Sequence, residues 1–218
     1  MQKKLKATKF IDSEAASVKD YAMQKTQHLH GNKARSIALY YAVRDEFYYD
    51  PYKIDLSLDG LKASTVLKQG YGWCVSKAIL LTACCRAINI PARLGFADVK
   101  NHLSTKRMRE VMQTDIFYWH GYSSIFIDGE WLKVTPAFNR QLCEKFSIQT
   151  LEFDGESDAI YHPYDLRGEK HMEYLYQRGD FDDLPLQQMM VTYQQKYKNF
   201  SGDITIGNDF LSDIEKEN

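Results

Sequence analysis

The 218-residue sequence has few cysteines, almost no net charge and no long hydrophobic run. Its four cysteines form no C-x-x-C pair, which argues against a structural zinc site and against a disulfide framework. The 28 lysines and arginines nearly balance the 29 aspartates and glutamates, leaving a net charge of -1. Such a chain has no overall field that would attract nucleic acid or an anionic membrane. No segment is apolar for long enough to span a bilayer.

The first ten residues are basic, but no apolar stretch follows them, as it would in a secretory signal. Together with the small number of cysteines, this predicts a cytoplasmic protein. The sequence indicates no cofactor and no metal site, and it does not indicate an oligomeric state.

Hydrophobic residues make up 44% of the chain and aromatic residues 13%, which is sufficient for a large core without disulfides. Helical and strand-like patterns both occur, so we expect an α+β fold. We expect residues 1–143 to form its core, including the N-terminal helices, and residues 144–218 to form an extension that packs on this core.

Hydrophobic spacing and breaker residues place the predicted elements. Helices are expected over residues 13–27, 33–49, 61–68, 74–88 and 186–200, and strands over residues 92–99, 115–127 and 130–135. Residues 100–113 are interpreted as a polar, basic connection with a solvated face, and bordering a substrate groove is the alternative. Residues 178–185 are interpreted as a loop that enters the last helix, and residues 201–218 as loosely held. The predicted helix over 74–88 is apolar almost all round, which is typical of a helix in the middle of a fold.

Cys74 follows a glycine-broken run and begins this central helix. The free N–H groups and the positive end of the helix dipole would favour a thiolate at this position. Cys84 and Cys85 lie within the same apolar helix and are interpreted as small core residues. Cys74 is therefore the candidate nucleophile. Redox chemistry at this thiol is a weaker alternative, because no resolving cysteine lies near it in the sequence.

The histidine nearest to Cys74 with strand context is His120, in the predicted strand over 115–127. Asp128-Gly129 is a strong hairpin signal that would pair this strand with residues 130–135. In a two-residue turn Ile127 faces Glu130, so His120 would face residue 137 and Thr135 would be its same-face diagonal neighbour. The backbones would then be about 7 Å apart. A Cys74–His120 nucleophilic pair is the leading hypothesis.

This order of parts resembles the transglutaminase-like superfamily, whose fold is similar to that of papain-type cysteine peptidases. The resemblance covers roughly residues 36–139, and residues 72–93 are its most specific stretch, with a cysteine at a helix start and a Pro-Ala-Arg exit. It implies a Cys-His-Asp triad that performs acyl transfer from amides. Cys74 matches the nucleophile and His120 the general base. The family aspartate falls at Thr135, which carries no carboxylate.

Three interpretations of this departure stay open. The first is an enzyme with a Cys74-His120-Thr135 triad, whose activity is weakened because Thr135 carries no charge. The second is an enzyme in which Asn139, Asp98 or Asp115 supplies the third member of the triad. The third is a scaffold that binds without turnover. An uncharged third group would be costly, since replacing the aspartate by asparagine in a serine-protease triad lowers the rate about 10⁴-fold.

Two functions are therefore carried forward. The first is a cysteine enzyme that acts on peptide or amide substrates through a thioester, with hydrolysis favoured over transfer to an amine. The second is a non-catalytic module that binds a peptide or a glycopeptide in the same groove. In both cases aromatic residues are candidate substrate contacts: Tyr71, Trp73, Trp119 and Tyr122.

Overall fold

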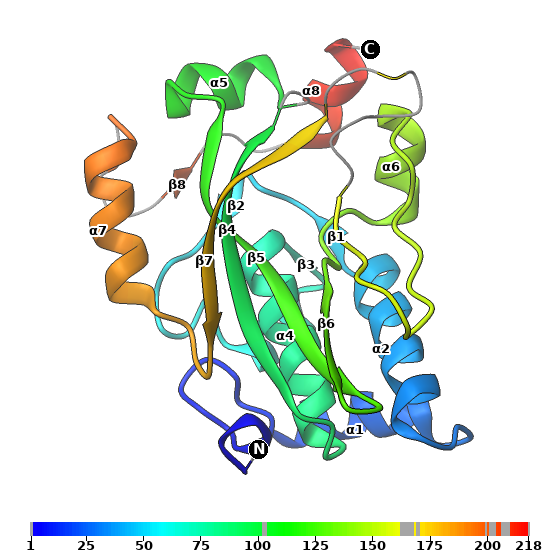
Figure 1. Cartoon of the computed structure of the whole chain (residues 1–218). Helices are drawn as coiled ribbons and strands as arrows, with labels where there is room; N and C mark the ends of the chain where they lie inside the picture. The colour runs from blue at the N-terminus through cyan, green and yellow to red at the C-terminus, as the bar shows by residue number, and fades with distance from the viewer. Residues whose placement is uncertain are drawn as a thin grey trace.

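One buried helix, α4 (Cys74–Ala87), packs behind a four-stranded antiparallel sheet (Figure 1). This computed structural model describes residues 2–101, 104–161, 168, 171–198, 200, 204–205 and 210–217. Helices and an antiparallel sheet are both present, so the expected α+β class is confirmed. The predicted start of the central helix at Cys74 is also confirmed.

The sheet has the strand order β6-β5-β4-β7, and every neighbouring pair is antiparallel. The long strands β4 and β5 form its centre, and the ladder between them is irregular beyond Ala97. The bounds of the strands are β4 (Ala92–Asn101), β5 (Ile116–Ile127), β6 (Glu130–Val134) and β7 (Met172–Phe181).

Every residue of α4 from Cys74 to Arg86 is buried, as the apolar pattern predicts for a central helix. One side of α4 contacts β5, and the N-terminal helices cover the rest (Figure 1). These helices are α1 (Ala16–Thr26), α2 (Asn32–Glu46) and α3 (Ala63–Gln69). The first turn of α4 is thereby fixed against the sheet.

Shorter elements complete the described chain. Near the N-terminus and beside α3 lie η1 (Gln2–Leu5), β1 (Tyr48–Tyr49), β2 (Lys53–Ile54) and β3 (Tyr71–Gly72). At the top of Figure 1 lie α5 (Lys106–Met112), α6 (Arg140–Phe146) and α8 (Phe210–Glu217), whereas α7 (Leu186–Lys196) flanks the sheet on one side. The strand β8 (Ile204–Thr205) pairs with β2.

The hairpin register is confirmed from Ser123↔Val134 to Ile127↔Glu130, but the pairing ends at Val134. Pro136 has no N–H to continue the ladder. The N–H of Thr135 instead donates to the carbonyl oxygen of Ala159 at 2.9 Å. Thr135 therefore follows the strand β6 and does not belong to it, which corrects the predicted strand over 130–135.

Three interpretations of the less regular segments are wrong. Residues 106–112 form the helix α5, whereas we expected a plain connection, and residues 178–181 are the end of β7, whereas we expected a loop. Residues 210–217 form α8, whose Phe210 and Ile214 are buried, so this part of the chain is not loosely held. The rest of residues 201–218 lies outside the described residues, apart from the backbone of β8.

The proposed division at residue 143 stays a prediction, although β7, from the second part, pairs with β4 over most of its length. Among the helices of the described ranges, we find none that is both long and apolar enough to cross a membrane.

Candidate active site

Cys74 is the first residue of α4, and a local cap holds it there. The hydroxyl of Ser76 accepts a hydrogen bond from the N–H of Trp73 at 3.0 Å and donates one to the carbonyl oxygen of Trp73 at 3.2 Å. A Cβ atom at Gly72 would lie 2.5 Å from this hydroxyl, so glycine leaves room for the cap. The sequence Gly-Trp-Cys-Val-Ser thus builds the start of the helix from short-range contacts.

The N-terminus of α4 lies very close to β5 at Gly121. A Cβ atom on Gly121 would lie 2.9 Å from the Cα of Val75, which is closer than a side chain can approach backbone. The backbone N–H groups of Gly121, Val75 and Cys74 itself act on the sulfur and favour its thiolate form. The strand and the helix therefore jointly place N–H donors around one thiol.

Burial outweighs these donors. Only 6% of Cys74 is exposed, and loss of solvation raises the pKa of its thiol to about 11. The expectation of a thiolate is therefore wrong for the protein without substrate. Low dielectric surroundings disfavour the charged form of any group, and here that cost exceeds the benefit of the helix N-terminus.

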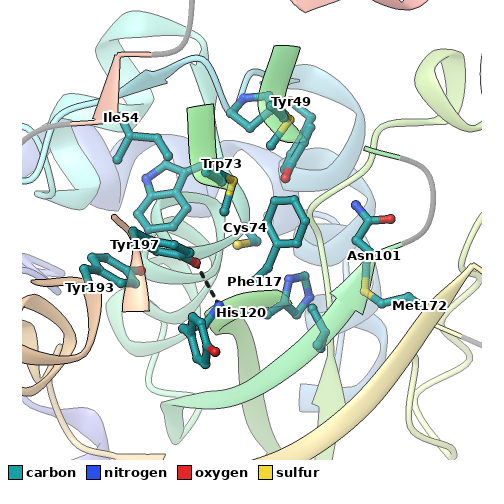
Figure 2. Close-up of a pocket in the computed structure, with 15 residues that line it drawn as sticks. Tyr49, Ile54, Trp73, Cys74, Asn101, Phe117, His120, Met172, Tyr193 and Tyr197 are labelled. Carbon is teal, nitrogen blue, oxygen red and sulfur yellow. Dashed lines mark hydrogen bonds between the residues drawn. The ribbon is translucent and has the colours of Figure 1, made fainter. Parts of the chain in front are cut away.

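His120 lies on β5 and lines the same pocket as Cys74 (Figure 2). The residue before it, Trp119, has a φ of 62°, a left-handed conformation that is uncommon for a residue with a side chain. Burial and, to a lesser degree, His171 lower the pKa of His120 to about 4, so its ring is neutral at physiological pH. Its Nε2 has no hydrogen-bond partner within the described chain.

Cys74 and His120, both described residues, share no hydrogen bond in the structure. Two tyrosine rings meet the imidazole by their edges: Tyr161 at 6.3 Å and Tyr174 at 6.4 Å between ring centroids. The pair is thus a neutral thiol and a neutral imidazole around one pocket, with the base held between aromatic rings.

The position of the family aspartate is filled by Thr135, which is 1% exposed. Its hydroxyl has no hydrogen-bond partner among the described residues, and neither has the hydroxyl of Tyr174. The two hydroxyls lie near enough for Thr135 to lower the pKa of Tyr174, although they do not meet hydrogen-bond geometry. Within the described residues, no hydrogen bond joins the hydroxyl of Thr135 to His120.

The three substitutes considered for the third group are engaged elsewhere. Asp98 forms a two-point ion pair with Arg178 and accepts the N–H of Trp119. Asp115 pairs with Lys100 at 2.9 Å. Asn139 precedes α6, where its side-chain oxygen accepts a backbone N–H at 3.3 Å. In the described residues, the structure therefore brings no carboxylate into hydrogen-bond contact with His120.

The pocket around Cys74 and His120 encloses about 540 Å³, including space that is open to solvent. Its walls come from residues far apart in the sequence, including α5, β7 and the end of α7. Besides Cys74, His120 and Asn101, the lining is aromatic or aliphatic: Tyr49, Pro51, Ile54, Trp73, Val99, Met108, Met112, Phe117, Tyr118, Met172, Tyr193 and Tyr197. Figure 2 shows Trp73, Phe117 and His120 gathered around the sulfur of Cys74.

Of the four predicted substrate contacts, only Trp73 lines this pocket. Tyr71 borders a separate, more open hollow. The ring of Trp119 stacks on Arg178, and its N–H donates to Thr192 of α7. Tyr122 covers Gly95 and donates to Asp180 at 3.3 Å. The assignments of Tyr71, Trp119 and Tyr122 to the Cys74 pocket are therefore corrected.

A buried lysine near the site was not anticipated. Lys77, one turn after Cys74, donates to the carbonyl oxygens of Arg44 at 2.9 Å, Phe47 at 2.6 Å and Ala137 at 2.8 Å. Burial lowers its pKa to about 7, but three carbonyl acceptors require the three N–H groups of the ammonium form. The only sequence signal for it was a lysine within an otherwise apolar helix.

No group of three or more histidine, cysteine or acidic side chains that could hold a metal ion occurs among the residues the structure describes. The chemistry available to this pocket from the chain itself is that of a thiol, an imidazole and backbone N–H groups. This set suits nucleophilic attack on a carbonyl carbon.

Comparison with known proteins agrees with this geometry. A family model described as the transglutaminase-like superfamily matches residues 19–136. No curated protein matches the sequence. A candidate cysteine protease from Cytophaga hutchinsonii has a similar fold, with a TM-score of 0.52 at 16% identity over 83% of this chain and 46% of its own. A candidate protease from Parabacteroides distasonis gives a TM-score of 0.38 at 18% identity, over 53% of this chain and 22% of its own. The chain thus spans less than half the length of either structure.

Proposed function

Because the chain belongs to the transglutaminase-like superfamily, we propose that it is a cysteine enzyme that acts on amide bonds through a thioester. One observation carries the proposal: Cys74 begins a buried helix, with backbone N–H groups around its sulfur and His120 on the wall of the same pocket. A nucleophile, a base and oriented N–H donors are the parts that acyl transfer requires.

The neutral state of both groups decides how the reaction begins. With the pKa of Cys74 near 11 and that of His120 near 4, an ion pair does not form in the free protein. The unbonded Nε2 of His120 would take the thiol proton as the sulfur attacks the carbonyl carbon of a bound amide. Negative charge then passes to the carbonyl oxygen, where backbone N–H groups would stabilise it.

The remaining steps regenerate the pocket. The imidazolium of His120 returns its proton to the leaving amine as the carbon–nitrogen bond breaks, which leaves a thioester on Cys74. Water, or in acyl transfer an amine, then attacks this thioester, with His120 again accepting a proton. Thr135 offers no charge to stabilise the imidazolium, so the proposal includes a low rate.

Turnover by a Cys74→Ala variant tests the proposal. Wild-type protein should cleave members of a peptide-amide library or couple them to an added amine, and mass spectrometry would detect either product. The variant should lose this activity completely. Cys85→Ala is the matched control, because Cys85 is a buried thiol on the same helix outside the pocket. Equal turnover by wild type and Cys74→Ala would rule out the thioester.

A binding module without turnover is the second candidate. It is favoured by the lack, among the described residues, of a carboxylate bonded to His120, and by the raised pKa of Cys74. In that case peptide amides would bind wild type and Cys74→Ala with equal affinity, and neither protein would release a product.

The compartment belongs to the same proposal. All four cysteines are free thiols in the structure, which a reducing compartment favours, so we retain the cytoplasm as the expected location.

A further inference from the structure

Within the described part of the chain, the walls of the Cys74 pocket carry no formal charge. Of the described residues, fifteen line it, and none of these is an aspartate, glutamate, lysine or arginine. The one titratable base, His120, is neutral above about pH 4. A ligand group that enters this pocket would therefore meet no counter-ion.

Charges near the mouth are already paired. The adjoining hollow, which shares Tyr49 with the pocket, contains Asp50 and Lys53, whose charged atoms are 3.1 Å apart. On α5, Arg107 pairs with Asp213 of α8 at 2.7 Å. These two ion pairs largely neutralise their own charges.

The surfaces that remain are large and adaptable. Met108 and Met112 of α5 face the pocket together with Met172 of β7, and methionine side chains adjust to the shape of an apolar ligand. Aromatic rings complete the wall, among them Trp73 and Tyr197. The hydroxyl oxygen of Tyr197 already accepts the N–H of Tyr118 at 2.9 Å, as the dashed line in Figure 2 shows.

We infer that this pocket selects an uncharged apolar side chain, aliphatic or aromatic, on the residue beside the attacked amide. The substrate class is then a peptide amide with such a residue at the cleavage or transfer site. The link to catalysis rests on the proposed function. The preference in binding follows from the apolar lining of the pocket and does not require turnover. An apolar side chain gains by leaving water here, whereas a charged one loses its hydration without a partner.

Binding and turnover can be measured separately with one peptide series. The peptides are acetyl-Gly-Gly-Xaa-Gly-Gly-amide, in which Xaa is Phe, Leu, Lys or Glu. Because the flanking glycines have no side chains, Xaa is the only group that can fill the pocket. Calorimetric titration into Cys74→Ala reports binding, and mass spectrometry with wild type reports turnover. The Phe and Leu peptides should bind at least about 100-fold more tightly than the Lys and Glu peptides.

A charged wall should reverse this preference. Met112→Glu, in the Cys74→Ala background, should weaken binding of the Phe peptide at least about tenfold and strengthen binding of the Lys peptide. Met112→Leu should keep the order of preference. Met23→Glu, on the exposed surface of α1, is the matched control for the added charge and should leave all affinities unchanged.

Each other outcome has a definite meaning. If the Lys or Glu peptide binds as tightly as the Phe peptide, or if no peptide binds, the inference is overturned whatever the turnover. If the Phe and Leu peptides bind selectively but wild type releases no product, the pocket inference stands and the proposed enzyme does not. Turnover of charged peptides at equal rates would support the enzyme and overturn the pocket inference.

Discussion

Cys74 and His120 form an uncharged pair, and this property sets their reactivity. Burial moves the two pKa values apart, to about 11 for the thiol and about 4 for the imidazole. At neutral pH the first value leaves Cys74 almost entirely as a thiol, and the second leaves His120 almost entirely as a neutral imidazole. Together they describe a site in which the charge first appears during the reaction, when substrate is present to receive it.

Alkylation of Cys74 by iodoacetamide should follow its thiolate fraction. For a pKa near 11 this fraction is on the order of one in 10⁴ at pH 7, so alkylation should be slow and should rise about tenfold per pH unit up to pH 9.5. Peptide mass spectrometry measures the rate, with Cys84 as an internal control, because this thiol is fully buried and burial raises its pKa well above the usual value. Fast alkylation that is already constant below neutral pH would instead reveal a cysteine–histidine ion pair.

Thr135→Asp should change this profile. A carboxylate at this position adds a negative charge near the His120 site, which should raise the pKa of the imidazole and increase alkylation of Cys74 at pH 7. Thr135→Asn is the matched control, because it adds the same shape without the charge. If both variants alkylate as wild type does, residue 135 does not act as the third group in this fold.

The sequence was sufficient to predict that Cys74 and His120 come together, but not most of their surroundings. Cys74 and His120 were identified because a helix start and a hairpin leave local signals, and both line one pocket. Trp119 was misplaced because its positive φ turns the side chain toward α7, and no residue type signals such a conformation in an aromatic run. Met112 and Tyr197 reach the site through tertiary packing alone, which a pattern along the chain does not contain.

At the level of elements, a buried lysine joins the central helix to the end of α2 and to the turn after β6. The ammonium group of Lys77 donates hydrogen bonds to the carbonyl oxygens of Arg44 and Phe47, at the end of α2, and of Ala137 in the turn after β6. These carbonyls have no strand or helix partner to replace it in their present arrangement. Lys77 thus ties the Cys74 helix directly to the turn at Ala137.

Replacing this cation should therefore be costly. Lys77→Met should lower the free energy of unfolding by at least about 3 kcal/mol, because it removes three hydrogen bonds and leaves buried carbonyls unpaired. Urea unfolding at pH 7 measures the loss. Lys68→Met, on the exposed surface of α3, should change stability by no more than about 0.5 kcal/mol. Similar midpoints for the two variants would show that water replaces the lysine at little cost.

The elements that were predicted well share a strong local period. The helix α4 and the register of β5 with β6 follow from apolar spacing and an Asp-Gly turn. The edge strand β7 was missed because Leu175 and Tyr176 are both exposed, so no alternation separates one face from the other. Its place was fixed by pairing with β4 across some 80 residues of chain, a contact that local sequence does not encode.

At the scale of the whole molecule, the buried histidine links stability to pH. The native pKa of His120 is about 4, and that of an unfolded histidine is about 6.5. Between these values the unfolded chain binds a proton that the native protein does not bind. Stability should therefore rise as the pH increases from 4 to 6.5, and should be fully present above pH 6.5.

His120→Gln should remove this dependence. Between pH 7 and pH 5 wild type should lose about 2 kcal/mol more unfolding free energy than the variant, as measured by urea unfolding at both values. His28→Gln, on the exposed surface near the N-terminus, should behave as wild type does. Parallel losses in wild type and His120→Gln would show that the imidazole is already protonated in the native state.

The residues that line the pocket are spread along the sequence from Tyr49 to Tyr197. This spread has a consequence for the order in which the pocket is made during translation. The ribosome adds Cys74 early, whereas Tyr193 and Tyr197 are added more than one hundred residues later. A nascent chain therefore carries the Cys74 thiol before the residues that complete the walls of its pocket have been made.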